Sequence, residues 1–524
     1  MRQATSFMKH PVKQFPRIAM TEFTCRTIDI LTGQHIVLLN QRDCERVDIR
    51  AHDRVNLKRG DKNVTATVDT TATIVAPGEI GITKDLTPEL SVREGDPIDV
   101  SLLPAPSSIY YIRNKIIGQK LSKDEIYSIV QDAVKGALAD VEIAGFLMGQ
   151  QFHGMSDEEQ VWLTRAMADT GEKIDFGKPV YDKHSVGGVP GNKVSLLIVP
   201  IVASAGLLIP KTSSRAITSP SGTADTMSVL APIEFSASEL KKLALKTGGA
   251  IVWGGGLNLA PADDIFIRVE HPLQIDPEPQ MIASIMAKKL AVGANFMVLD
   301  LPVGHEAKIP SSDEGRRLSF KFINMGDKLG IKVRCGITYG GQPVGYAIGP
   351  ALEAREALQA LEGKGPNSLV EKSTALAGML LELGGKAGRG EGQHLATEIL
   401  ASGKALEKMS EIIEAQGGNG ATRSAEIAVG QCTVEIVAPV DGYITRVSNA
   451  AMNQIARAAG APIEKGAGIV LHGREGHKVS KGQKIMEIFA ERDSRVEEAY
   501  NLAVKLAPIS IEGMLLQEVS SDSS

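Results

Sequence analysis

The chain has 524 residues, of which 43% are hydrophobic and 23% charged, and its formal net charge is −5. This composition is typical of a globular protein, and the length predicts about three domains of roughly 150 residues each. The acidic balance excludes a general electrostatic attraction to nucleic acid or to an anionic membrane surface. Four widely spaced cysteines form no C-x-x-C pair, which leaves zinc and thioredoxin-type sites unsupported.

The sequence contains no stretch of about 18 uncharged apolar residues, so we predict no membrane span. Residues 1–17 are basic but have no apolar core of the secretory kind. We therefore expect a cytoplasmic protein with neither a membrane nor a nucleic acid as its partner.

The N-terminal part, residues 1–105, is rich in β-strand signals. Short runs of β-branched residues at 35–40, 63–69 and 98–103 are separated by turn sequences such as Arg-Gly-Asp. These runs predict a small β-barrel domain, which ends at a proline-containing boundary near residue 105.

Helical signals follow in residues 106–175 and again at about 262–292. Ser122 with Glu125, and Ser156 with Glu159, have the spacing of capping boxes. Apolar residues recur behind the first box at the spacing of a helix face. We predict an α-helical domain built from both segments, so that the chain crosses between domains more than once.

Apolar runs alternate with helical segments in residues 176–261 and 293–432. This alternation predicts a large α/β domain with a largely parallel or mixed sheet. Residues 433–524 return to strand and turn signals and predict a C-terminal α+β domain of the barrel-sandwich type. The expected fold class is therefore α/β multidomain with a β-rich part at each end.

The segment 182–195, DKHSVGGVPGNKVS, is the most informative part of the chain. Lys183, His184, Ser185, Lys193 and Ser195 flank a Gly-Gly turn that leads into an apolar helical run. Glycines let backbone N–H groups approach a ligand, and a helix N-terminus attracts negative charge. The segment predicts an anion site, with phosphate as its ligand.

A second segment, residues 213–226, has the sequence SSRAITSPSGTADT and also joins an apolar run to a helix start. Its hydroxyl groups can donate hydrogen bonds to phosphate oxygens, and Arg215 adds a planar fork of donors. Two such loops close together in sequence favour a phosphate site over an ordinary polar loop.

Several motifs resemble the thymidine/pyrimidine-nucleoside phosphorylase family. They are K-H-S-x-G-G-V at 183–189, K-V-S-L at 193–196, Ser213-x-Arg215, Gly222-Thr223-x-Asp225 and S-I-M-A-K-K-L at 284–290. The resemblance covers roughly residues 107–510. The β-rich extension, and the sequence at 216–221 in place of a glycine-rich loop, are similar to the longer branch of the family, which includes archaeal AMP phosphorylases.

The resemblance implies phosphorolysis, in which inorganic phosphate attacks the anomeric carbon of a nucleoside. We expect thymidine and phosphate to give thymine and 2-deoxyribose 1-phosphate. The alternative within the family is an AMP phosphorylase, which gives the base and ribose 1,5-bisphosphate. Neither reaction requires a cofactor or a metal, and the implied ligands are phosphate and a nucleoside or nucleotide.

The resemblance also implies roles for individual residues. The phosphate would be held by Lys183, Ser185, Gly188, Ser195, Ser213 and Thr223. His184 and Asp276 are the candidate proton donors to the leaving base, and an N-terminal helix cap is the alternative role for Asp276. The substrate would contact Ser214, Arg215, Ala216, Ile217, Thr218, Ser219, Ser284, Lys288 and Lys308. Lys289 lies off the face shared by Ser284 and Lys288, so we expect it to be solvated.

Two other classes of function remain open. A phosphoribosyltransferase of related fold would need acidic residues that hold magnesium on a pyrophosphate, and the two loops offer no acidic pair. A binding or assembly module would rely on the β-rich ends. In the longer branch the N-terminal extension serves assembly, which implies a homodimer or a larger homo-oligomer.

Overall fold

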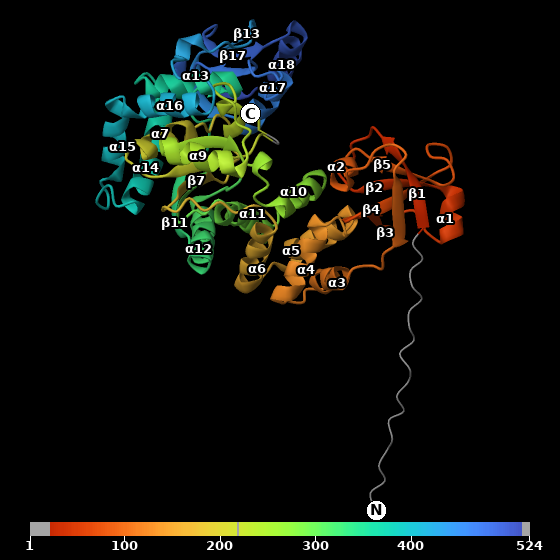
Figure 1. The fold of residues 1–524 in the computed structure, drawn as a ribbon. Helices are drawn as coiled ribbons and strands as arrows, with labels where there is room; N and C mark the ends of the chain where they lie inside the picture. The colour runs from red at the N-terminus through yellow and green to blue at the C-terminus, as the bar shows by residue number, and fades with distance from the viewer. Residues whose placement is uncertain (1–20, 217–218, 516–524) are drawn as a thin grey trace, which may run out of the picture. The chain divides into compact units, whose positions relative to one another are not determined.

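The computed structural model describes residues 21–216 and 219–515 (Figure 1). The chain forms two compact units, one made of Met1–Glu159 with Ile265–Glu278 and the other of Gln160–Asp264 with Pro279–Ser524. The finer four-part division expected from the sequence stays a prediction. Over the described ranges, no helix has the length and apolar character needed to cross a bilayer.

The first unit begins with a closed six-stranded barrel, which confirms the predicted β-rich domain. Its strand order is β1-β5-β2-β4-β3-β6, and alternate side chains such as Val55 and Leu57 fill the interior. The elements are β1 (Thr21–Ile28), β2 (Ile36–Asn40), α1 (Gln41–Val47), β3 (Arg54–Arg59), β4 (Lys62–Thr71), β5 (Glu79–Thr83), α2 (Leu86–Leu90) and β6 (Pro97–Leu102).

Helices complete the first unit. They are α3 (Ser108–Ile116), α4 (Lys123–Val134), α5 (Asp140–His153), the start of α6 (Asp157–Asp169) and most of α10 (Pro261–Leu273). The capping box of Ser122 and Glu125 is confirmed, since the Ser122 N–H donates to the Glu125 carboxylate and the Glu125 N–H to the Ser122 hydroxyl. Phe266 of α10 is buried beside Phe146 of α5, with ring centroids 6.1 Å apart. This contact ties a late segment of the chain to the early helices.

The second unit is built on parallel strands. β11 (Lys332–Tyr339), β10 (Phe296–Val303) and β7 (Tyr181–Ser185) form one sheet, and β8 (Ile209–Ser213) pairs with β9 (Gly249–Trp253). A parallel bridge from Val180 to Leu208 links the two sheets. All these pairings are parallel, which favours the largely parallel sheet over the mixed one, the two alternatives expected here. The helical crossovers between consecutive strands bring each strand back in the same direction.

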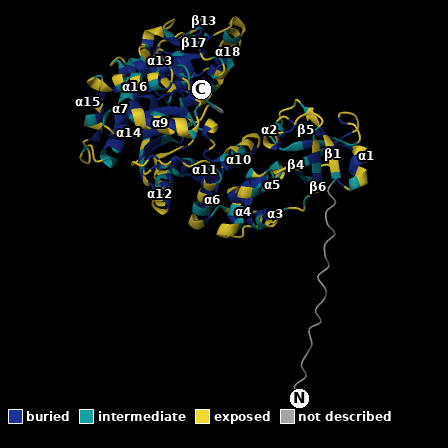
Figure 2. Cartoon of the chain, viewed as in Figure 1, coloured by how far each residue is buried: buried dark blue, intermediate teal, exposed yellow. Residues whose placement is uncertain are grey.

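Helices accompany the parallel strands. They are α7 (Ser195–Ser204), α8 (Thr223–Met227), α9 (Ala237–Thr247), α11 (Glu278–Ala291), α12 (Ser312–Leu329), α13 (Pro350–Leu361), α14 (Asn367–Leu383), α15 (Gly392–Ala401) and α16 (Lys404–Ala415), with short 3₁₀ turns η1 (Gly255–Leu257) and η2 (Ser424–Glu426). α7 is apolar on every side and is buried from Ser195 to Ala203 (Figure 2). Its N-terminus is therefore held rigidly beside the strands.

The C-terminal part combines two antiparallel sheets with two helices, while the barrel-sandwich type expected for it stays a prediction. One antiparallel sheet has the order β12-β15-β17-β13 and a second has the order β16-β14-β18. The elements are β12 (Ala347–Ile348), β13 (Cys432–Val437), β14 (Gly442–Val447), α17 (Asn449–Ala458), β15 (Gly468–Leu471), β16 (Lys478–Val479), β17 (Lys484–Ala490), α18 (Asp493–Leu506) and β18 (Ile509–Glu512). The two helices and both sheets share one apolar core.

Candidate functional site

The two segments singled out in the sequence meet at one edge of the parallel sheet. β7 ends at Ser185 and β8 ends at Ser213, and the bridge between Val180 and Leu208 makes these strands neighbours. Ligands of open parallel sheets bind beyond the carboxyl ends of the strands. The candidate phosphate residues of both loops therefore lie where such a ligand is expected.

The Gly-Gly turn brings backbone from a third strand connection close to this edge. Gly187 and Gly188 both have φ of +88°, which side chains other than glycine's rarely adopt. A Cβ on Gly188 would come within 2.9 Å of the Lys308 backbone nitrogen. Lys308, which follows β10 and is exposed, is thus placed against the predicted phosphate turn.

Asp300 on β10 organises the floor of the site. Its side chain is fully buried, and it accepts a hydrogen bond from the Ser185 hydroxyl. Lys183 Nζ lies 3.8 Å and Lys372 Nζ 3.1 Å from its Oδ2, while Thr338 donates to Oδ1 at 2.6 Å. Burial disfavours the charge, but the two lysines outweigh it and lower the pKa of Asp300. Asp300 is therefore an ionised anchor for two predicted phosphate residues.

Asp182 on β7 forms a second buried cluster. Lys289 Nζ lies 2.6 Å from one carboxylate oxygen and Lys211 Nζ 3.9 Å from the other. The expectation that Lys289 is solvated was wrong, because its side chain is only 2% exposed. It lies off the face of Ser284 and Lys288, but its ammonium group is buried against Asp182 of β7 rather than facing water.

The same clusters shift the proton affinities of the groups around them. Burial lowers the pKa of Lys183 to about 8 and that of Lys211 to about 7, and neighbouring lysines add to the effect. Burial, with Lys289, Lys211 and Lys183 nearby, holds the pKa of His184 well below its ordinary value. His184 is consequently a neutral imidazole at neutral pH.

The second loop is closed by Asp225. Its Oδ2 accepts hydrogen bonds from the backbone N–H of Ala216 at 2.6 Å and of Gly222 at 2.9 Å. The Arg215 guanidinium lies 3.8 Å from the same carboxylate, donates to Glu234 at 2.7 Å and stacks over Trp253. Both ends of the loop, near Ser214 and Thr223, are thereby drawn together, with Ser219 half-buried between them. Ile217 and Thr218 lie outside the described residues.

The residues expected to contact the base fall on different elements. Ser284 is half-buried on α11, and Lys288 one turn later pairs with the buried Asp263 at 2.6 Å. Burial opposes the charge of Lys288, but this ion pair outweighs it and raises the pKa of the ammonium group. Asp276 belongs to the other compact unit, where it is exposed two residues before α11.

Ser195 and Lys193 of the first loop lie in different surroundings from each other. Ser195 is buried as the first residue of α7, at the helix N-terminus where an anion is favoured. Lys193, expected at the anion turn, was wrongly assigned. Its ammonium group is buried against Glu356 at 2.5 Å and donates to the backbone oxygens of Val344 and Ala347. It therefore serves the core and not the ligand.

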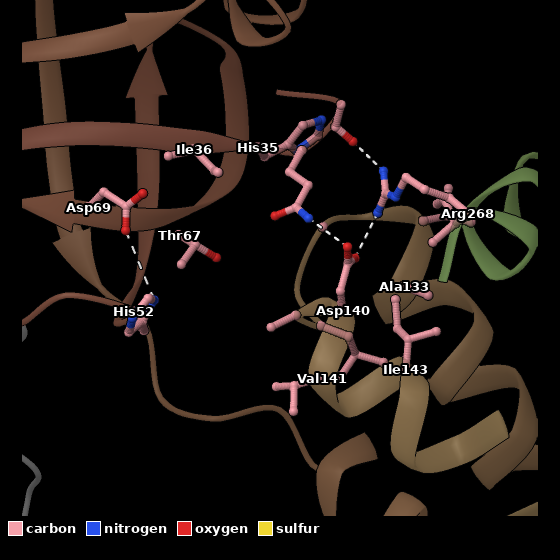
Figure 3. A pocket seen from close by; sticks show the side chains of 17 residues that line it. His35, Ile36, His52, Thr67, Asp69, Ala133, Asp140, Val141, Ile143 and Arg268 are labelled. Atoms are coloured by element: carbon pink, nitrogen blue, oxygen red, sulfur yellow. Dashed lines mark hydrogen bonds and ion pairs between the residues drawn. The ribbon is translucent and has the colours of Figure 1, made fainter. Parts of the chain in front are cut away.

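A cavity of about 410 Å³ lies in the first unit, between barrel residues and the helices (Figure 3). Arg268 points into it and donates to the Gly33 carbonyl and to Asp140, whose other oxygen accepts from Gln34. Arg268 is thus taken up by contacts with the barrel and with a helix of the same unit. Its guanidinium is structural in this unit.

Comparison with protein families identifies three matching segments. The glycosyl transferase family helical bundle domain matches residues 109–171, and the family's a/b domain matches residues 177–406. The pyrimidine nucleoside phosphorylase C-terminal domain matches residues 443–510. Anthranilate phosphoribosyltransferase from Thermus thermophilus has a similar fold, with 20% identity and a TM-score of 0.50 over 58% of this chain and 98% of that one.

Relatives match almost the full length. AMP phosphorylase from Methanococcoides burtonii is 50% identical over 94% of this chain and 98% of its own. AMP phosphorylase from Thermococcus kodakarensis is 48% identical over 95% and 99%. The expectation of thymidine phosphorolysis was wrong, because relatives this similar are named for AMP, and with it the assignment to pyrimidine metabolism loses its support.

The chain is thus a pentosyltransferase of the nucleoside phosphorylase kind. The matched domains and the full-length relatives show that it belongs to the thymidine/pyrimidine-nucleoside phosphorylase family, in the long branch that includes the archaeal AMP phosphorylases.

Proposed function

We propose that this protein is an AMP phosphorylase, which converts AMP and inorganic phosphate into adenine and ribose 1,5-bisphosphate. The observation that carries the proposal is the 50% identity to an AMP phosphorylase over 94% of the chain. The aligned region includes both loops at the edge of the parallel sheet and the N-terminal barrel.

The charge of the site supports phosphate as the nucleophile. Lys183 supplies an ammonium group, and Ser185, Ser195, Ser213 and Thr223 supply hydroxyl groups around the ends of β7 and β8. Gly188 adds a backbone that a ligand can approach closely. Phosphate provides its own nucleophilic oxygen, so the protein needs only to position it and stabilise the charge that develops on the sugar.

One proton has to reach the base when the glycosidic bond breaks. A phosphate oxygen bonds to the anomeric carbon, and the bonding electrons leave with the ring nitrogen, which must be protonated or strongly hydrogen-bonded. His184 is a poor acid because burial and the surrounding lysines hold its pKa low and keep it neutral. We propose that Asp276 is the donor, a role that requires its carboxyl group to be protonated when the nucleotide is bound, and that His184 donates a hydrogen bond to the sugar or base.

The second loop is the proposed site for the nucleotide. Ser214, Arg215, Ala216 and Ser219 would surround the 5′-phosphate, and Lys308 would add a charge from the neighbouring turn. Ser284 and Lys288 would contact the base. Arg215 now pairs with Glu234, and exchange of this carboxylate for a phosphate suits its fork of donors.

The test is a direct assay of purified protein with phosphate and either AMP, adenosine or thymidine, followed by chromatography of the free base and the sugar phosphate. Release of adenine from AMP, with ribose 1,5-bisphosphate as the second product, supports the proposal. Absence of adenine release, or faster release from adenosine than from AMP, contradicts it.

We also propose that the protein is a homodimer or a larger homo-oligomer. Large apolar side chains are exposed on α3, at its C-cap and on α5 of the first unit: Tyr110 at 63%, Ile117 at 67% and Phe152 at 73%. Apolar groups gathered on packed helices favour a protein interface over open water. A second copy of the chain is the partner that we assign to this surface.

A further inference from the structure

The buried floor of the phosphate site carries more positive than negative charge. In the described part of the chain, four lysine ammonium groups face the two carboxylates of Asp182 and Asp300, a formal surplus of two positive charges. The lysines are Lys183, Lys211, Lys289 and Lys372. Uncompensated buried charge is costly, so a protein retains it where a ligand of opposite charge enters.

Lys211 has the longest ion-pair distance of this group, 3.9 Å, close to the 3.8 Å of Lys183. It is buried on β8, its ammonium group donates to the neighbouring Thr212 carbonyl, and its distance of 3.9 Å from Asp182 exceeds that of Lys289, at 2.6 Å. Asp182 is therefore held mainly by Lys289. Lys211 stands two residues before Ser213, one of the residues that would hold phosphate.

We propose that Lys211 is a further positioning residue for phosphate, which gains a proton when the dianion enters the site and thereby completes the neutralisation of its charge. The proposal rests on one part of the proposed function, the binding of inorganic phosphate. It does not depend on whether the second substrate is a nucleoside or a nucleotide.

The groups that face Lys211 explain the direction of the change. On β7 it faces the carboxylate of Asp182, the ammonium of Lys183 and the neutral ring of His184, and on α11 it faces Lys288 and Lys289. Burial and these cations disfavour its charged form, whereas Asp182 and the hydrogen bond to the Thr212 carbonyl favour it. A dianion placed among the lysines reverses the local potential, so the charged form of Lys211 becomes the stable one.

Proton uptake on binding is the direct readout. We would titrate the full chain with inorganic phosphate by calorimetry at about pH 8, in buffers of different ionisation enthalpy, because free phosphate is then already mostly dianionic. We expect uptake on the order of one proton, shared between Lys211 and Lys183. Sulfate, a dianion that does not titrate in this range, is the second probe and should also drive uptake. Absence of uptake with both anions would overturn the proposal.

Two variants separate charge from structure. Lys211→Met should lower the affinity for phosphate by on the order of tenfold or more and should reduce the proton uptake, without lowering the melting temperature of the phosphate-free protein. Lys211→Arg keeps a permanent charge, so it should retain more affinity than Lys211→Met while taking up fewer protons than the wild type. Unchanged uptake in Lys211→Met would contradict the proposal.

A control variant tests whether the loss of a buried lysine elsewhere in the protein also changes phosphate affinity and proton uptake. Lys115 is buried in the first unit and has its own partner, Glu159, at 3.0 Å. The double change Lys115→Met with Glu159→Gln should leave phosphate affinity and proton uptake as in the wild type. If the protein binds no phosphate at all, the phosphorylase assignment itself fails, which is a different result from binding without proton uptake.

Discussion

Asp300 and Lys372 form a buried ion pair, with 3.1 Å between the carboxylate oxygen and the ammonium nitrogen. The carboxylate also accepts the hydroxyl hydrogen bond of Ser185 and faces Lys183. Lys372 comes from α14, far along the chain, so one carboxylate links three elements beneath the site. Asp300 therefore orients two of the side chains that are predicted to bind phosphate, Lys183 and Ser185.

The substitution Asp300→Asn should therefore lower catalytic activity by more than the accompanying loss of fold stability can explain. We expect kcat/KM for phosphate to fall by about a hundredfold, because Lys183 and Ser185 lose their common anchor. Asp43→Asn is the matched control, since Asp43 is a buried carboxylate in the barrel that accepts from the Gly78 N–H at 2.6 Å. Steady-state kinetics beside thermal melts would check the prediction, and equal kinetic losses in both variants would contradict it.

The pH dependence of the reaction should report the buried lysines. Lys183, with a pKa of about 8, and Lys211, with a pKa of about 7, lose their charge as the pH rises through these values. The free enzyme then attracts phosphate less, so kcat/KM for phosphate should decline across this range. Because bound phosphate favours the charged lysines, kcat at saturating phosphate should decline less. A kcat/KM that rises with pH would be inconsistent with this arrangement.

Proton donation to the base can be tested by comparison of two variants. Asp276→Asn should lower kcat with AMP by roughly a hundredfold to ten-thousandfold, and His184→Asn should cost less. A nucleotide whose base leaves without a proton, such as an N7-methylated purine nucleotide, should recover most of the Asp276→Asn loss. Equal losses with both nucleotides would remove Asp276 from the donor role.

Arg215 should discriminate between nucleotide and nucleoside. Arg215→Ala should raise KM for AMP by roughly tenfold or more, since a charge-assisted hydrogen bond to phosphate is lost, with little effect on KM for inorganic phosphate. Glu234→Gln removes the carboxylate that now occupies the guanidinium and should lower KM for AMP. Initial rates with AMP and adenosine measure both effects, and equal losses for the two substrates would show that Arg215 does not read the 5′-phosphate.

The assembly state should respond to charge on the exposed face of α3 and α5. Phe152→Glu combined with Ile117→Glu should shift the mass measured by light scattering toward the monomer, because a buried carboxylate in an apolar interface is costly. Val504→Glu is a control at another exposed apolar position, 63% accessible on α18. An unchanged mass in the double variant would exclude this face as the interface.

The elements with local signals could be predicted from the sequence. The barrel followed from short strands and turns, and the helix starts at Ser122 and Ser156 followed from capping residues three positions apart. The sheet direction was harder, because parallel pairing depends on which connections cross over and not on the strands themselves.

The floor of the site could not be predicted, because its contacts join residues far apart in the chain. Lys289 reaches Asp182 across 107 positions, and Ser185 reaches Asp300 across 115. A lysine at helical spacing is expected in water unless its buried partner is known, which explains the error on Lys289. Lys193 was assigned to the anion turn because its partner Glu356 is far away in the sequence. The substrate was misassigned because serine- and glycine-rich loops indicate phosphate but do not distinguish a nucleoside from its 5′-monophosphate.

The interrupted first unit has a consequence for synthesis on the ribosome. Its early helices leave a place for Phe266, which emerges only after the whole Gln160–Asp264 segment of the second unit. The nascent barrel can close early, but the helices beside it must wait with an apolar surface uncovered. A chain released before residue 278 would therefore be a substrate for chaperones, even though its barrel is already folded.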